Sequence, residues 1–147
     1  MFLSYSDTDP SPNVITETVS SLLEKTYFTE KKVKLVLFFN NILAGLGILD
    51  LQKLQNLWDV PMIFISENEP HNDKIIQLIK DLKYDEQYSN VLKKNPSNWI
   101  KIYHTRLYGL AINISNKDMI EVIQNLQLAG DIPEPLRIAD MIAKTVH

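Results

Sequence analysis

The stretch Val33-Lys34-Leu35-Val36-Leu37-Phe38-Phe39 decides the fold of this 147-residue chain. Six of its seven residues are apolar, which is typical of a strand with both faces covered by helices. A second short apolar run at 61–65 predicts another buried strand, parallel to the first. The residues that we expect to be buried in these adjacent strands are Val33, Leu35, Leu37, Phe39, Ile63 and Ile65.

Working outward, apolar residues recur at helical spacing on both sides of this strand. We expect helices over 13–27, 48–58, 70–82, 115–127 and from 133 onward, and strands at 1–6, 99–103 and 107–113. The segment 83–97 is polar and predicts a poorly packed helix or loop, and 7–12 reads as a turn. The alternation of strands and helices predicts one α/β domain over residues 1–147, with no linker.

Local signals mark several helix ends. Ser115 and Asp118 form a capping-box pattern at a helix start, and Gly130 follows that helix, where a left-handed residue is common. Pro133-Glu134-Pro135 suits the first turn of the last helix. Leu136, Ile138, Ala139 and Ile142 should form the packed side of that helix.

Composition excludes several classes of protein. The chain has no cysteine, so disulfides, thiolate zinc sites and a cysteine nucleophile are excluded. The net charge of −3 argues against a broad non-specific nucleic-acid surface. The first twelve residues do not read as a signal peptide, and no apolar run approaches the ~20 residues of a membrane span. We expect a cytoplasmic protein without a membrane contact.

Common catalytic motifs are absent. Ala44-Gly45-Leu46-Gly47 follows a strand, where phosphate loops occur, but it lacks the third glycine and the lysine, which favours a plain strand-to-helix turn. The histidines, His71, His104 and His147, have no metal-ligand spacing with one another. No serine lies in a nucleophile-elbow context.

Two stretches together resemble a known family. The first is 34–61, with Ala44-Gly45-Leu46-Gly47-Ile48-Leu49-Asp50-Leu51 and then Val60-Pro61, and the second is 130–139, with Pro133-Glu134-Pro135-Leu136-Arg137 as its most specific part. They resemble the archaeal family numbered ninety-nine among the domains of unknown function, which is similar to endonuclease V. The resemblance covers about 31–147.

The resemblance implies an RNase H-like mixed sheet flanked by helices. It also implies acids at strand ends that hold Mg²⁺ or Mn²⁺, which activates water against a phosphodiester. This chain departs from the family pattern twice. The first family strand looks missing or shortened, with Asp7 and Asp9 matching a later turn, and Phe39-Asn40 stands where the family has Asp-Gly.

The remaining candidates are therefore few. Asp7, Asp9 and Asp50 are the candidate catalytic acids, although Asp50 also suits the first turn of a helix. Asn40, Gly45, Gly47 and Arg137 are candidate binding residues. Arg137 either contacts a phosphate or a partner carboxylate, or pairs with Glu134 to fix the helix start.

Three functions remain open at this point. The leading hypothesis is a non-catalytic or impaired endonuclease V-like domain that binds a protein partner, a second copy of itself or nucleic acid, without a cofactor. A shortened first strand would leave an open sheet edge, which invites pairing with another chain. The alternatives are an active metal-dependent endonuclease, with Mg²⁺ or Mn²⁺ on the three aspartates, and a structural subunit of a larger complex.

Overall fold

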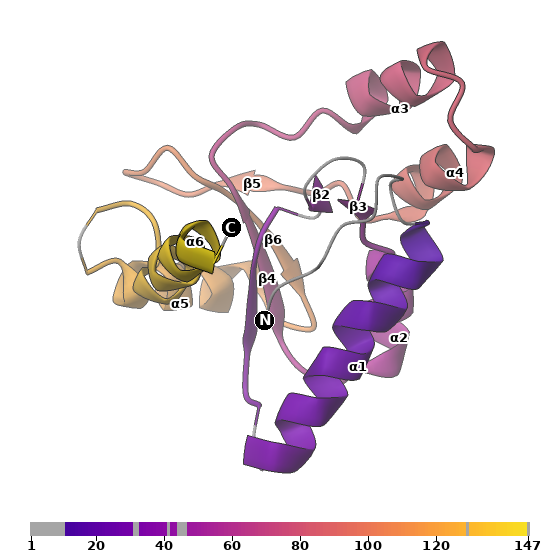
Figure 1. Cartoon of the computed structure of the whole chain (residues 1–147). Coiled ribbons are helices and arrows are strands. Elements are labelled where there is room, and N and C mark those ends of the chain that lie inside the picture. Colours follow the sequence, from indigo (N-terminus) through magenta and orange to yellow (C-terminus); the bar gives the residue numbers. More distant parts are fainter. Residues whose placement is uncertain (1–10, 31–32, 41, 44–46, 129, 147) are drawn as a thin grey trace.

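A computed structural model describes residues 11–30, 33–40, 42–43, 47–128 and 130–146 (Figure 1). Within these ranges the helices are α1 (Pro12–Glu30), α2 (Leu51–Leu57), α3 (Asn72–Asp81), α4 (Glu86–Lys94), α5 (Asn116–Leu126) and α6 (Glu134–Val146). The strands are β1 (Val36–Phe39), β2 (Ile42–Leu43), β3 (Gly47–Ile48), β4 (Met62–Ser66), β5 (Ile100–Lys101) and β6 (Tyr108–Ile112). The strand expected at 1–6 lies outside the described residues, and Pro12 opens α1 rather than closing a turn.

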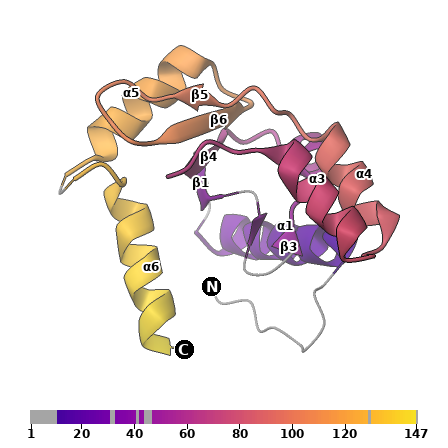
Figure 2. The same ribbon diagram turned by 90° about the horizontal axis from the view of Figure 1, so that it is seen from above.

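The central sheet is mixed, with its strands in the order β1-β4-β6-β5. β1 and β4 are parallel, with Val36 opposite Met62 and Phe39 opposite Ile65. β6 is antiparallel to β4 on one side and to β5 on the other, so β5 and β6 form the expected hairpin. Helices lie on both faces of the sheet (Figure 2), which confirms the expected α/β class.

β4 divides its side chains between two cores, because successive residues of a strand point to opposite faces. Met62 and Phe64 pack in the core formed with α1 and α2. Ile63 and Ile65 pack in the core formed with α5 and the first turn of α6. All five residues of β4 are buried, as its central position requires.

β1 differs from the expectation, because it is an edge strand of the described sheet. Its parallel pairing with β4 is as predicted, and Ile63 and Ile65 are buried. The expected burial of Val33, Leu35, Leu37 and Phe39 is wrong. The first three are only half-buried, and Phe39 is 38% exposed. With one neighbouring strand instead of two, their side chains have fewer atoms to pack against.

The segment after β1 also differs from the prediction of a turn followed by a helix. Gly47 and Ile48 form β3, which pairs antiparallel with β2, so α2 begins at Leu51 rather than at Ile48. Ile48 is buried in a third apolar cluster with α3 and α4. Ile48 therefore fits the apolar spacing because it packs in this cluster, and not because it belongs to α2.

The segment expected to be poorly packed contains the well-packed helix α4. Tyr88 and Leu92 are buried against Ile76 and Ile79 of α3. These apolar residues lie at positions 88, 91 and 92, which is helical spacing on a narrow face. Ser89 is buried with them, while the other polar residues of α4 are exposed and obscured this face in the sequence.

The two last helices begin where the sequence predicted. Ser115 Oγ accepts a hydrogen bond from Asp118 N at 3.1 Å, which is the N-cap of α5. Gly130 has the positive φ of +116° but lies three residues beyond the C-cap Gln127.

Among the described helices, none combines the length and the apolar character needed to cross a membrane.

The packed side predicted for α6 is wrong in most of its residues. Leu136 is 9% exposed and joins the sheet core, while Ile138 is 46% and Ile142 is 49% exposed, and Ala139 is exposed as well. α6 contacts β1 and then projects beyond it (Figure 2). The periodicity correctly predicted a helix, but of the four predicted residues only Leu136, in the first turn, packs into the sheet core.

Candidate functional site

Asp50 is the candidate acid that the structure describes, and its carboxylate caps a helix. Asp50 Oδ1 accepts a hydrogen bond from Lys53 N at 3.0 Å, and Asp50 has the extended backbone of an N-cap residue. The carboxylate thus satisfies one of the free amide groups at the start of α2. This is the structural role that the sequence offered as an alternative to catalysis.

Two buried polar side chains hold the backbone around Asp50. Thr16 Oγ1 of α1 accepts from Asp50 N at 2.9 Å and donates to Pro12 O. Asn95, just after α4, accepts from Leu51 N at 2.9 Å and donates to Leu49 O at 2.8 Å. Thr16 is fully buried and Asn95 is 4% exposed, so these bonds are shielded from water.

Sequence reasoning did not single out Thr16 or Asn95. Each lies in an otherwise unremarkable stretch, and each is bonded to a segment more than thirty positions away. A buried side chain of this kind is required because the backbone groups of 49–51 are not all paired within secondary structure. Asn95 follows the last lysines of α4, and its position as the C-cap of that helix was the available signal.

The ammonium group of Lys53, in the first turn of α2, bonds to side chains of α1. Lys53 Nζ contacts Asn13 Oδ1 at 2.5 Å and Glu17 Oε1 at 3.4 Å, which joins α2 to the exposed side of α1. Across the described ranges, no group of three or more His, Cys, Asp or Glu side chains could hold a metal ion. Metal-assisted hydrolysis by Mg²⁺ or Mn²⁺ needs closely spaced ligands, and the described residues place Asp50 outside any such cluster of three or more.

The other candidates from the sequence are dispersed or undescribed. Asp7, Asp9 and Gly45 lie outside the described residues. Asn40 directly follows β1 with φ of +67°, a conformation that asparagine tolerates, and its N–H donates to Ile65 O at 2.7 Å. Gly47 lies in the β2–β3 hairpin.

Arg137 is bonded within its own helix. Its Nε donates to Glu134 Oε2 at 2.9 Å and its Nη2 bonds to Glu134 Oε1, a two-pronged pair. Hydrogen bonding to Arg137 lowers the pKa of Glu134, and the same bond raises the pKa of Arg137. This is the bonding that the structural interpretation of Arg137 expects, while a role in binding stays a prediction.

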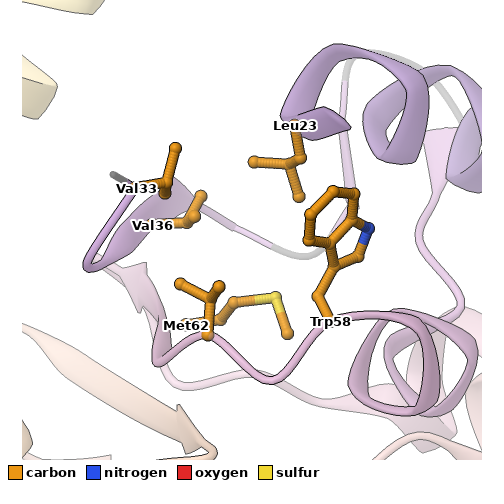
Figure 3. A pocket seen from close by; sticks show the side chains of 6 residues that line it. Leu23, Val33, Val36, Trp58 and Met62 are labelled. Atoms are coloured by element: carbon orange, nitrogen blue, oxygen red, sulfur yellow. The ribbon is translucent and has the colours of Figure 1, made fainter. Parts of the chain in front are cut away.

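Two hollows lie away from these residues. An apolar crevice between α1, β1 and the end of α2 is lined by Leu23, Val36, Trp58 and Met62, and it is too narrow to admit water (Figure 3). A shallower, open hollow lies at the start of α3, beside Trp99. The buried Trp99 Nε1 has no hydrogen-bond partner within the described ranges.

Comparisons with known proteins agree with this fold. The family model described as Endonuclease dU matches residues 13–147. A UPF0215 protein of Thermococcus kodakarensis is 28% identical over 120 residues, which cover 79% of this chain and 60% of that protein. A UPF0215 protein of Pyrococcus horikoshii is 25% identical, with 90% of this chain and 67% of that protein covered.

A solved structure shares the fold. It is the crystal structure of a protein of unknown function from Archaeoglobus fulgidus, with a TM-score of 0.77 and 16% sequence identity. The match covers 89% of this chain and 73% of that chain. The chain thus spans about three fifths of the length of the first curated relatives and about three quarters of the solved neighbour.

Proposed function

Because the chain belongs to the Endonuclease dU family, we propose that it is a nuclease-related binding domain that does not itself cleave nucleic acid. The observation that carries the proposal is the engagement of Asp50. Its carboxylate accepts from Lys53 N as the N-cap of α2, and its backbone N–H donates to the Thr16 hydroxyl. Among the described residues, Asp50 belongs to no group of three or more His, Cys, Asp or Glu side chains that could hold a metal ion.

Metal-dependent cleavage needs closely spaced carboxylates, since the ions must contact both the attacking water and the scissile phosphate. Phe39 and Asn40 occupy the end of β1, where an acid would serve this purpose, and neither supplies a carboxylate. An RNase H-like, endonuclease V-like ancestry is part of the proposal. It is supported by the parallel β1–β4 pair with helices on both faces.

A binding role is supported by the open side of the sheet. β1 has an unpaired edge among the described strands, and its residues include no charge and no proline to discourage pairing. The net charge of −3 and the commitment of Arg137 to Glu134 favour a protein partner or a second copy over nucleic acid. We propose that this binding takes place in the cytoplasm and without a bound cofactor.

An active metal-dependent endonuclease is the second candidate. It is favoured by the family description, which names an endonuclease, and by the candidate acids Asp7 and Asp9. Under this alternative, those acids and Asp50 would share Mg²⁺ or Mn²⁺.

A cleavage assay separates the two candidates. We expect the purified protein to leave DNA containing deoxyuridine or inosine, plain DNA and RNA intact with Mg²⁺ or Mn²⁺. The decisive variant is Asp50→Asn, because asparagine keeps the N-cap but is a weak neutral metal ligand. Cleavage by the wild-type protein that vanishes in Asp50→Asn, with unchanged thermal stability, would establish the endonuclease.

Asp50→Ala is the matched control for folding. It removes the N-cap and should lower the free energy of unfolding by ~1 kcal/mol. The activity of a contaminating nuclease would not change with this substitution. Activity that persists in both variants comes from a contaminant and leaves the proposal standing.

A further inference from the structure

α6 carries an apolar stripe on the side that faces away from the chain body. Ile138, Met141 and Ile142 are 46%, 54% and 49% exposed. At roughly 100° per residue, they lie on the side of the helix opposite Leu136, which is the residue that packs into the sheet core. The stripe is therefore not an extension of the packed face but a second, exposed face, on which Met141 Sδ accepts from Arg137 Nη1 at 3.1 Å.

The position of α6 leaves this stripe accessible. The helix contacts β1 through its beginning and then projects past the edge of the sheet (Figure 2). Three neighbouring large apolar side chains at i, i+3 and i+4 are the anchors of helix-to-helix contacts. A contiguous exposed patch of this kind marks an interaction site more often than scattered apolar residues do.

The charges of α6 alternate in sign along the helix. Glu134, Arg137, Asp140 and Lys144 read minus, plus, minus, plus, and they form the pairs Glu134–Arg137 and Lys144–Asp140 within the helix. The order reverses sign when the helix is read backwards. Two antiparallel copies can therefore be aligned with Glu134 near Lys144 of the other copy, whereas Asp140 lies one turn from Leu136 on the other side of the helix.

The same alignment overlaps the apolar stripes. Glu134 and Lys144 are equidistant from position 139. A two-fold axis near this point brings Ile138 of each copy beside the middle of the other helix. Opposite charges flanking an apolar seam set orientation and partner choice in helix pairs.

We propose that the α6 stripe is a self-association surface, which binds α6 of a second copy of this chain in antiparallel orientation. This inference rests on the proposed binding function and names its partner. The helix is neutral over its four charged residues, so two copies of an acidic chain meet there without like-charge repulsion. The contact is isologous, as most homodimer contacts are.

Sedimentation analysis of the full chain over a wide concentration range tests the proposal. We expect a monomer–dimer equilibrium in the wild-type protein. Met141→Lys should raise the dimer dissociation constant by roughly tenfold or more, because it places a charge in the apolar seam. The control is Leu78→Lys on α3, which replaces a similarly exposed residue (49%) and should leave the equilibrium unchanged.

A mixing experiment tests the antiparallel orientation. Lys144→Glu and Glu134→Lys should each weaken self-association, since each places like charges opposite one another. The two variants mixed together should associate again, because both opposed pairs regain opposite signs. Far-UV circular dichroism confirms that each variant remains folded.

Three results would overturn the proposal. They are a monomeric wild-type protein at every concentration, a dimer that Met141→Lys leaves intact, and a mixture that does not recover association. The first would indicate that another partner, or another segment of chain, covers the stripe. These results are independent of cleavage, so a monomer without nuclease activity would refute this inference alone, and a dimer that cleaves would refute only the proposed function.

Discussion

β4 and β1 are neighbouring strands of similar apolar sequence, yet they have opposite surroundings. Every residue of β4 is buried between β1 and β6, whereas β1 is half-buried and ends at the exposed Phe39. The aromatic rings of Phe38 and Phe64 stack at 4.5 Å across the pair, so the shared side of β1 is well packed. The difference arises because β1 has one neighbouring strand among those described.

The largest expected effect compares two residues that face each other in the sheet, Ile63 and Leu37. Ile63→Ala should cost ~2–5 kcal/mol, because it opens a cavity in a fully buried core. Leu37→Ala should cost roughly half as much, because its side chain is only half-buried. Urea unfolding measures both, and equal losses would contradict the edge position of β1.

The next largest effect should come from the loss of the buried hydrogen bonds of Asn95. Asn95→Ala removes its hydrogen bonds to Leu51 N and Leu49 O, and we expect a loss of ~0.5–1.5 kcal/mol for each of the two bonds. The control is Asn13→Ala, which removes an exposed amide on α1 that contacts Lys53, and which should stay within ~0.5 kcal/mol. Thermal unfolding of both variants compares a buried with an exposed amide, and similar losses would refute the role of Asn95.

The smallest effect is expected for the partly exposed ion pair between Arg137 and Glu134. The hydrogen bond from Arg137 lowers the pKa of Glu134, so its contribution to stability is present at neutral pH. It is lost as the pH falls through the lowered pKa, where the carboxylate becomes protonated. Arg137→Ala should raise the pKa of Glu134 toward its ordinary value in an NMR titration. An unchanged titration would show that the pair does not persist in solution.

The sequence predicted most elements of the fold, because local patterns decide them. The apolar runs at 33–39 and 61–65 predicted the parallel pair, and Ser115 predicted the start of α5. The same patterns could not distinguish a central strand from an edge strand. A run such as Val36 to Phe39 is compatible with both, and which one it becomes depends on strands elsewhere in the chain.

The candidate site was less predictable, because its contacts join distant positions. Asp50 was recognised as a helix-start acid from its local context. Of the two side chains that hold its backbone, Thr16 carries no local signal, and Asn95 offers only its position as the C-cap of α4. The packed side of α6 was mispredicted for a related reason. Periodicity shows that Leu136 and Ile142 belong to a helix, but not how many turns of that helix pack against the rest of the chain.

Thr16 and Asn95 together form a polar clasp on the backbone of residues 49–51, and its two halves can form only in sequence during synthesis. Thr16 is made before Asp50, but Asn95 follows it by more than forty residues. A chain emerging from the ribosome can therefore complete one half of the clasp while the backbone groups of Leu49 and Leu51 still bond to water. β4 likewise waits for β6 before its second edge is paired. The nascent chain thus leaves the second edge of β4 unpaired until residue 112 has left the ribosome.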